Sequence, residues 1–261
     1  MKKILHYFIF LFSMTASLSY AQTWNPVGST GFSVDSVRFT SIAIDGNSLP
    51  YVVYSDASNG WKATVMKYGG SSWATLGSSG FSSARAYSTM IAIDSLNTPY
   101  VIYEDSVNGN KATVMKYNGS TWVNVGSPGF SAGAAFSPSI AIDRSGSPYV
   151  AYQDAGNSYK ATGMKFNGST WINVGSPGFS PGQAGYTNIA IDKNGTPYVV
   201  YKDFANSSKA TIMEFNGTSW VIVGSAGISM GAADYNSIAI DKNGTPYVVF
   251  HDAGNGWRIR G

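Results

Sequence analysis

Apolar and polar positions alternate in short blocks along this chain, and the blocks recur at a fixed interval. Ser139-Ile-Ala-Ile-Asp143 and Pro148-Tyr-Val-Ala-Tyr152 are two apolar segments joined by a short polar turn. The pair occurs five times, and Asp94 and Asp143 show the interval of 49 residues (143 − 94). A period of roughly 50 residues is typical of repeat architectures. The aspartates that close the first segment are Asp45, Asp94, Asp143, Asp192 and Asp241.

Each unit contains four segments with the pattern of β-strands. In the second unit they are Ile91-Ala-Ile93, Tyr100-Val-Ile-Tyr103, Lys111-Ala-Thr-Val-Met115 and Thr121-Trp-Val-Asn-Val-Gly126. None has helical spacing over a useful length. The first two segments are apolar at successive positions, which indicates burial on both faces of a sheet. Four-stranded sheets stacked around an axis give that burial, so we predict an all-β protein, a β-propeller of four-stranded blades.

The phase of the repeats predicts five blades. The fourth segment occurs first at Trp24–Gly28, before any complete unit, whereas the last unit ends in a third segment at Trp257–Arg260. Pairing of these two ends would complete the fifth blade and remove two exposed sheet edges. We therefore expect a ring closed by the N-terminal strand. A fragment of a longer array is the alternative, which the end of the sequence at Gly261 favours.

The turns between the segments support this assignment. Asn118-Gly119, between a third and a fourth segment, is a signal for a two-residue type I′ turn. The turn between the first and second segments needs a left-handed residue, which Gly195 or Asn97 can supply. Ser48 holds this position in the first unit, so we expect that copy of the turn to be the most strained.

The N-terminus has the composition of a secretory signal peptide. Lys2 and Lys3 precede an apolar run at Ile4–Phe12, and small and polar residues then lead to Ala21. We expect residues 1–21 to be removed and residues 22–261 to be secreted or held at the cell surface. No other segment approaches the roughly 20 apolar residues of a membrane span, so none is expected.

Composition excludes several classes of site. The sequence has no cysteine, which excludes zinc–thiolate sites and cysteine nucleophiles. Without Lys2 and Lys3 it holds 15 basic residues (17 − 2) against 14 acidic residues, and no basic cluster predicts nucleic-acid binding. We expect no metal, no cofactor and a monomer.

One segment carries a resemblance to known repeats. Ser237-Ile-Ala-Ile-Asp-Lys-Asn-Gly-Thr-Pro-Tyr-Val-Val249 resembles the core of secreted bacterial β-propeller repeats of the SBBP and NHL kind, in which these elements recur once per blade. Asn118-Gly-Ser-Thr-Trp122 is similar to the end of the Asp-box turn of sialidase-like propellers, but Tyr117 stands where that box has its aspartate. The resemblance implies a propeller fold and supplies no catalytic residues.

A repeated aspartate follows the second segment of every unit, and a basic residue comes six positions later. A ring of carboxylates is a candidate for binding a sugar or a metal, and a cross-strand ion pair is the structural alternative. Repetition in all units favours the structural alternative, because sites on a fold are usually made of unlike residues. The aspartates are Asp56, Asp105, Asp154, Asp203 and Asp252, and the basic residues are Lys62, Lys111, Lys160, Lys209 and Arg258.

The position just before that basic residue differs from unit to unit, and we call its occupants the tip residues. We expect them on a loop face, where the loops joining segments two to three and four to one come together. Aromatic side chains there could stack on sugar rings or bind a protein partner, and packing on a neighbouring loop is the alternative. The tip residues are Trp61, Asn110, Tyr159, Ser208 and Trp257.

A second set of aromatic residues precedes the first segment of each unit. Packing between blades is their expected role, because a buried ring covers a large apolar area, and binding in the central channel is the alternative. The set is Phe39, Tyr87, Phe136, Tyr186 and Tyr235.

The sequence holds no recognisable catalytic motif. His251 is the one histidine after the predicted signal peptide, and no nucleophile elbow accompanies it. Glu104, beside Asp105, is the least implausible enzymatic position, although adjacent strand residues face opposite sides of a sheet. We therefore expect a secreted, non-catalytic module that recognises carbohydrate or a surface protein through its loop face. The alternatives are a structural repeat of a larger surface or adhesion protein and, more remotely, a glycosidase or lyase.

Overall fold

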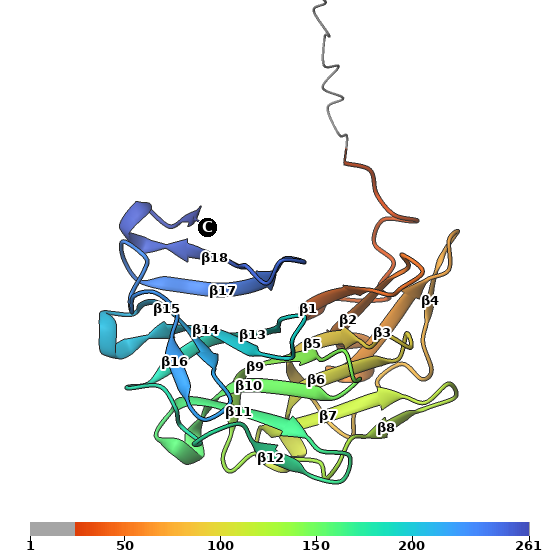
Figure 1. Cartoon of the computed structure of the whole chain (residues 1–261). Helices are drawn as coiled ribbons and strands as arrows, with labels where there is room; N and C mark the ends of the chain where they lie inside the picture. Colours follow the sequence, from red (N-terminus) through yellow and green to blue (C-terminus); the bar gives the residue numbers. More distant parts are fainter. Residues whose placement is uncertain (1–23, 261) are drawn as a thin grey trace, which may run out of the picture.

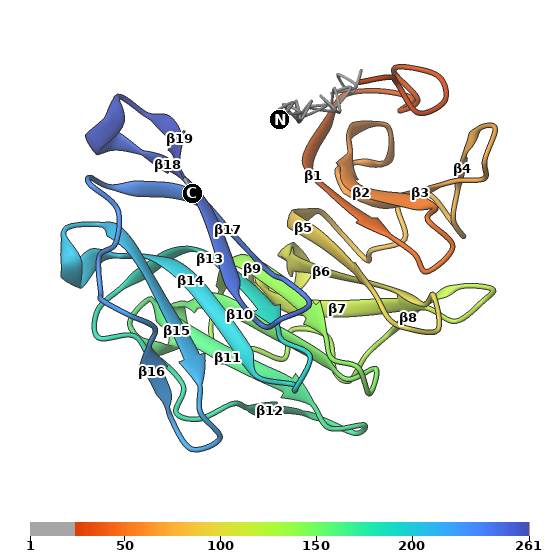
Figure 2. The same cartoon turned by 45° about the horizontal axis from the view of Figure 1, so that its top comes forward.

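The computed structural model describes residues 24–260, so the predicted signal peptide at residues 1–21 lies outside the described residues. Its strands form five antiparallel sheets that fan around a central axis (Figures 1 and 2). The prediction of an all-β propeller with five blades is confirmed. Among the described residues, we find no helix with the length and apolar character needed to cross a membrane.

The chain fills each blade in sequence order, from the axis outward. Blade 1 contains β1 (Val37–Ile44), β2 (Pro50–Asp56), β3 (Lys62–Tyr68) and β4 (Trp73–Thr75). Blade 2 contains β5 (Ala86–Ile93), β6 (Pro99–Asp105), β7 (Lys111–Tyr117) and β8 (Trp122–Asn124). Blade 3 contains β9 (Ala135–Ile142), β10 (Pro148–Asp154), β11 (Lys160–Phe166) and β12 (Trp171–Asn173). Blade 4 contains β13 (Ala184–Ile191), β14 (Pro197–Asp203), β15 (Lys209–Phe215) and β16 (Trp220–Ile222). Blade 5 contains β17 (Ala233–Ile240), β18 (Pro246–Asp252) and β19 (Arg258–Arg260).

A short 3-10 helix joins the second and third strands of every blade. These helices are η1 (Ala57–Asn59), η2 (Ser106–Asn108), η3 (Ala155–Asn157), η4 (Phe204–Asn206) and η5 (Ala253–Asn255).

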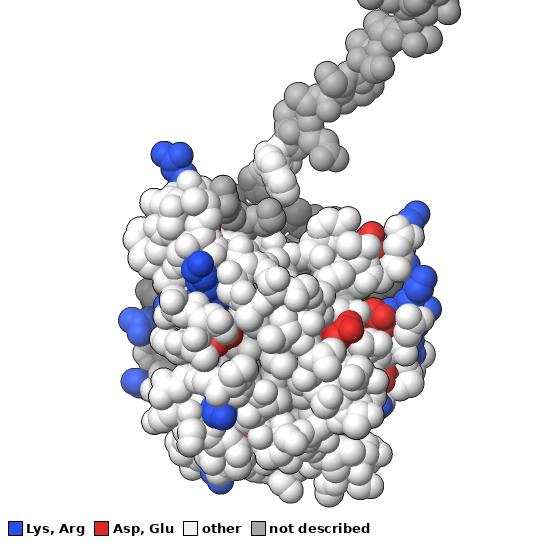
Figure 3. All heavy atoms as spheres, turned by 60° about the vertical axis from the view of Figure 1, so that its left-hand side comes forward, with Lys and Arg blue, Asp and Glu red and all other residues white. Residues whose placement is uncertain are grey.

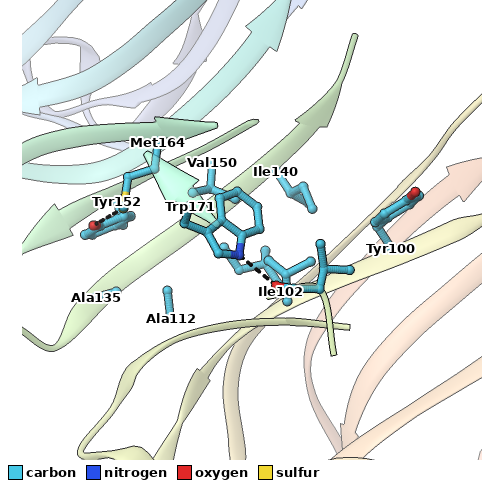
Figure 4. Close-up of a cluster of buried hydrophobic side chains, with 11 residues drawn as sticks. Tyr100, Ile102, Ala112, Ala135, Ile140, Val150, Tyr152, Met164 and Trp171 are labelled. Atoms are coloured by element: carbon cyan, nitrogen blue, oxygen red, sulfur yellow. Dashed lines mark hydrogen bonds between the residues drawn. The ribbon is translucent and has the colours of Figure 1, made fainter. Parts of the chain in front are cut away.

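The core lies between the blades, as double-sided burial predicted. Figure 4 shows the cluster between blades 2 and 3, where Ile102 of one blade and Ile140 and Val150 of the next are buried together. Trp171 joins this cluster, and its indole N–H donates to the backbone carbonyl of Val125 over 2.7 Å. The ring also stacks on Phe130, with 4.3 Å between ring centroids. Each outer strand is therefore anchored to the blade before it.

The ring is not closed by a strand. Residues 24–28 form no strand, Trp24 is 100% exposed, and the described part of blade 5 has three strands. The described part of blade 5 thus lacks the outer strand that β4 supplies to blade 1, where it pairs with Met66, Lys67 and Tyr68 of β3.

The flanks of blades 1 and 5 remain uncovered as a result. Ile42 of β1 is 63% exposed, whereas its counterpart in blade 2, Ile91, is 5% exposed because blade 1 packs on it. Tyr247 and Val249 of β18 are likewise exposed, although their counterparts in the other blades are buried. Figure 2 shows blades 1 and 5 as the two ends of the fan.

The turns agree with the sequence only in part. Ser48 has a φ of 63°, in the left-handed region, so the strained turn expected in blade 1 is confirmed. The type I′ turn at Asn118-Gly119 is wrong, because four residues separate β7 from β8 and of this pair only Gly119 has positive φ, at 100°. The Asn118 side chain accepts hydrogen bonds from the backbone N–H groups of Ser120 and Thr121, which favours the longer loop.

Candidate functional site at the loop face

Two sets of loops meet on one face of the propeller, as the sequence predicted. The N–H of Phe81, in the loop between β4 and β5, donates to the carbonyl of Ala63 at the start of β3. The N–H of Ala57 at the start of η1 donates to the carbonyl of Ser36 in the loop before β1. The loops after the second and fourth strands therefore support each other, and we call their common surface the loop face.

The repeated aspartates lie beneath this face and are buried. The carboxylate of Asp56 accepts hydrogen bonds from the Ser58 N–H (3.0 Å), the Asn59 amide (2.8 Å) and the Thr64 hydroxyl (2.9 Å). Burial by itself would raise the pKa of Asp56, but these hydrogen bonds together lower it. Lys62 lies opposite in register, as expected, yet the carboxylate turns toward the loop, so caps and not an ion pair hold it.

The same arrangement recurs in the other blades. Asp154 accepts from Gly156, Asn157 and Thr162. Asp203 accepts from the corresponding Ala205, Asn206 and Thr211. Asp105 and Asp252 also cap their 3-10 helices through a backbone N–H. These aspartates organise the loop, and their buried carboxylates do not form its outer surface.

The tip residues, in contrast, stand on the outside of the loop. All five have a left-handed backbone: φ is 65° at Trp61, 60° at Asn110, 61° at Tyr159, 63° at Ser208 and 59° at Trp257. Non-glycine residues adopt this conformation rarely. In blades 1, 2, 3 and 5 the backbone is held there because the tip N–H donates to the carbonyl of the capping aspartate, as Trp61 does to Asp56 over 2.7 Å. We call the capping aspartates and the hydrogen bonds that hold each loop its frame. The frame fixes the backbone of the tip residue, and the side chain can differ from blade to blade.

A pocket of about 510 Å³ lies on the axis, and we call it the axial pocket. The inner strands of all five blades line it, from Phe39, Thr40 and Ser41 in β1 to Tyr235, Asn236 and Ser237 in β17. A β-bulge interrupts each inner strand at this level, for example between Arg38 and Ser41. The bulge residues are left-handed as well: Phe39, Ser88, Ser137, Tyr186 and Tyr235.

The second aromatic set therefore divides between two places. Phe39, Tyr186 and Tyr235 are bulge residues that line the axial pocket, as the central-channel alternative predicted. Tyr87 and Phe136 come one position earlier and contact rings of the loop face: Tyr87 lies 6.2 Å from Phe39, and Phe136 lies 6.1 Å from the tip residue Tyr159. The expected packing between blades occurs within this set at two boundaries: Phe39 with Tyr87, and Tyr186 with Tyr235. Phe130 also packs between blades, on Trp171.

Ring contacts connect the axial pocket to the tip residues. Tyr235 lies 6.3 Å from His251, which lies 5.2 Å from Trp257. On blade 1, the guanidinium of Arg38, next to Phe39, lies 4.6 Å from the ring of Trp61. Tyr186 and Tyr235 lie 4.9 Å apart across the boundary of blades 4 and 5. The pocket and the tips form one surface, which is the candidate functional site.

Charged groups around this site are held by protein partners. Lys202 of blade 4 pairs with Asp234 of blade 5 over 2.6 Å, and it also lies over the ring of Tyr186. Glu104 is 8% exposed and accepts from the Ser137 N–H. Burial raises the pKa of Glu104, although hydrogen bonds from Ser88 and Ser137 oppose that shift. Elsewhere charge is sparse, and Figure 3 shows basic and acidic side chains scattered over one side of the molecule.

Other cavities have a more uniform lining. One of about 720 Å³ opens between blades 3 and 4 near the turns of the opposite face. Its lining residues Tyr149, Lys165 and Phe215 correspond to Tyr100, Lys116 and Phe166 in a cavity of about 250 Å³ between blades 2 and 3. Among residues 24–260, no group of three or more His, Asp or Glu side chains is arranged to hold a metal ion.

No known family model matches this sequence, and no curated protein is similar to it at a significant level. Solved structures with the same fold include the Aleuria aurantia lectin in complex with Fucα1-6GlcNAc, with 17% identity, a TM-score of 0.54, and coverage of 81% of this chain and 70% of that one. A Penicillium chrysogenum α-L-arabinanase complexed with arabinobiose has 11% identity and a TM-score of 0.55, over 81% of this chain and 74% of that one. A Hadza microbial sialidase has 11% identity and a TM-score of 0.57, over 82% of this chain and 52% of that one. At these identities the likeness shows the propeller fold alone.

Proposed function

We propose that this protein binds carbohydrate through its loop face, with the axial pocket and the tip residues as the site. One observation carries the proposal: five blades share one frame, and side chains that differ from blade to blade gather around a single pocket. Aromatic rings at Tyr235, Trp257 and Trp61 offer flat apolar faces for the C–H groups of a sugar. Serine, threonine and asparagine side chains of the pocket supply hydrogen bonds for its hydroxyls.

Two further points support a sugar ligand. A concave site with an apolar lining and a few convergent polar groups is the usual form of a small-ligand site. The structural neighbours named above include a lectin and enzymes that act on sugars. Export, as predicted from residues 1–21, would bring the site to extracellular glycans.

A glycan array followed by calorimetry with the purified chain tests the proposal. Replacing Trp61 and Trp257 together by alanine is expected to lower affinity at least about tenfold, because aromatic anchors carry much of the binding energy. Trp24→Ala is the matched control, since Trp24 is fully exposed and belongs to no blade. Absence of binding to any glycan, or equal binding by the double variant, would overturn the proposal.

A glycosidase is the second candidate, and Glu104 is the observation that favours it. Burial raises the pKa of its carboxyl group, as burial does for the general acid of glycoside hydrolases. Hydrolysis of a bound oligosaccharide that disappears in Glu104→Gln would support this candidate. An oligosaccharide that stays intact after long incubation with the unaltered chain would exclude it for that ligand.

A further inference from the structure

The axial pocket is lined by uncharged side chains. Of the described residues that line it, none is acidic or basic: they are aromatic, hydroxyl, amide and small apolar residues. The charged groups nearby point to protein partners instead. Lys202 is paired with Asp234, Arg38 lies over Trp61, and Glu104 accepts hydrogen bonds from Ser137. A ligand group that enters the pocket therefore meets no free counter-charge from the described residues.

One polar atom of the pocket is left without a partner. Asn236 is 7% exposed, and its amide nitrogen donates to the carbonyl of Tyr186 over 3.4 Å. Its Oδ1 is buried and has no hydrogen-bond partner among the residues that the structure describes. Buried polar atoms are nearly always satisfied, so an exception calls for an explanation.

The other blades show that this free acceptor is not needed for the fold. Thr187 occupies the same position in blade 4, and its hydroxyl donates to the carbonyl of Ser137 over 2.7 Å. Thr89 donates in the same way to the carbonyl of Phe39 in blade 1. A threonine thus donates its one hydroxyl hydrogen to a backbone carbonyl of the neighbouring blade. Asn236 makes the same contact with its nitrogen and adds a carbonyl oxygen that no other blade supplies at this level.

The backbone around the pocket is also unusual. Five non-glycine bulge residues surround it with φ between 47° and 54°, and Tyr186 and Tyr235 are two of them. Rare backbone conformations that persist in non-glycine residues concentrate at ligand sites, because the surrounding structure must hold them in place. Here they direct two tyrosine rings and Phe39 to the axis beside Asn236.

We infer that the axial pocket receives the uncharged end of a glycan, a neutral sugar residue, and that the Asn236 carbonyl accepts a hydrogen bond from one of its hydroxyls. The inference rests on the proposed function and specifies its ligand. A neutral sugar supplies the donor that Asn236 lacks and stacks on the rings of Tyr186 and Tyr235. A sugar acid in the same place would lose its hydration without gaining a counter-charge.

Calorimetry with the full chain and two matched sets of trisaccharides tests this. One set ends in neutral arabinose, galactose or fucose, and the other ends in glucuronic acid. The neutral set is expected to bind at least about tenfold more tightly. Asn236→Thr, which copies Thr40, Thr89 and Thr187 of blades 1, 2 and 4, is expected to lower the affinity for neutral trisaccharides about 3- to 10-fold, the size of one hydrogen bond. Trp24→Ala, which lies outside the blades and the pocket, should leave affinity unchanged.

The outcomes separate this inference from the function on which it rests. Equal affinity for both sets, or unchanged affinity in Asn236→Thr while Trp257→Ala still weakens binding, overturns the axial pocket as the neutral-sugar site and leaves glycan binding at the tips. Absence of binding to either set overturns both. Asn236→Thr should melt within a few degrees of the unaltered chain, which shows that a loss of binding is not a loss of folding.

Discussion

Asp203 and Ser208 lie in the same loop of blade 4, five residues apart, but the first position is the same in every blade and the second varies. Asp203 is one of five identical, buried aspartates, and it holds three donors of its own loop. Ser208 is one of five tip residues that are all exposed in part and nearly all different. The repeats therefore keep the residues that shape the loop and vary the residues that the loop presents. Candidate binding residues in such a chain are found by comparing its blades, because residues that are identical in all blades hold the structure of the loop.

The contrast extends to ionisation. Hydrogen bonds lower the pKa of the frame carboxylates Asp56 and Asp143, in spite of burial. Burial raises the pKa of Glu104, which belongs to the variable positions beside the pocket. Hydrogen bonds thus stabilise the ionised form of these frame carboxylates, whereas burial disfavours the ionised form of Glu104.

The largest effect is expected where the frame joins two blades. Trp171→Ala should destabilise the fold by about 3–5 kcal/mol, because it empties a buried ring site and breaks the bond to Val125. Tyr159→Ala, at the tip of the same blade, should cost less than about 1 kcal/mol. Urea denaturation measures both. Similar losses for the two variants would show that tip and frame are not energetically distinct.

A smaller loss is expected from a loop aspartate. Asp203→Ala should cost about 3 kcal/mol, since it leaves Thr211, Asn206 and a backbone N–H without their charged acceptor. Ser208→Ala is the control in the same loop, with a change within about 0.5 kcal/mol. If chemical denaturation gave Asp203→Ala the same midpoint as its control, the cap would not organise the loop.

Acid should weaken the frame. The pKa values of Asp56 and Asp143 are lowered in the folded state, so their stabilisation is present above the ordinary aspartate pKa of 3.8 and is lost as the pH falls through the folded-state pKa. Urea midpoints measured from pH 7 to pH 3 should therefore fall most steeply below about pH 4. Asp143→Asn should flatten that fall, and an unchanged profile would remove Asp143 from the explanation.

The smallest effect has the opposite sign. The pKa of Glu104 is raised in the folded state, so ionisation of this group costs stability as the pH rises above its unfolded value. Glu104→Gln should then equal or exceed the stability of the unaltered chain at pH 7, by less than about 1 kcal/mol. A clear loss of stability at pH 7 would place Glu104 with the frame.

Much of the fold could be read from the repeat itself. The segment Lys111–Met115 predicted β7. Asp143, one of the aspartates that close the first segment, accepts from the N–H groups of Ser145 and Ser147 in the turn that follows. Periodicity fixes such elements because each blade must bury the same faces against its neighbours.

The site was less accessible to sequence reasoning. The tips were found, because they differ while their neighbours repeat. The axial pocket was missed as a unit, since bulges at Ser88 and Ser137 carry no glycine to mark a left-handed residue. The aromatic residues also shift by one position between blades, from Tyr87 to Tyr186, and in a strand one position changes the face. Asn236 gave no signal beyond replacing a threonine.

The bonds from Trp122, Trp171 and Trp220 to carbonyls 46 residues earlier join blades 2, 3 and 4 each to the blade before it. The stability of each blade in such a chain depends on its contacts with the neighbouring blades. Amide exchange should therefore be fastest in blade 5, the last blade of the series, and slowest in blade 3, which has such a bond to the blade on each side. An extra copy of the repeat inserted in the middle would form the same tryptophan–carbonyl bond with each neighbour. The number of blades could therefore increase without any new type of contact.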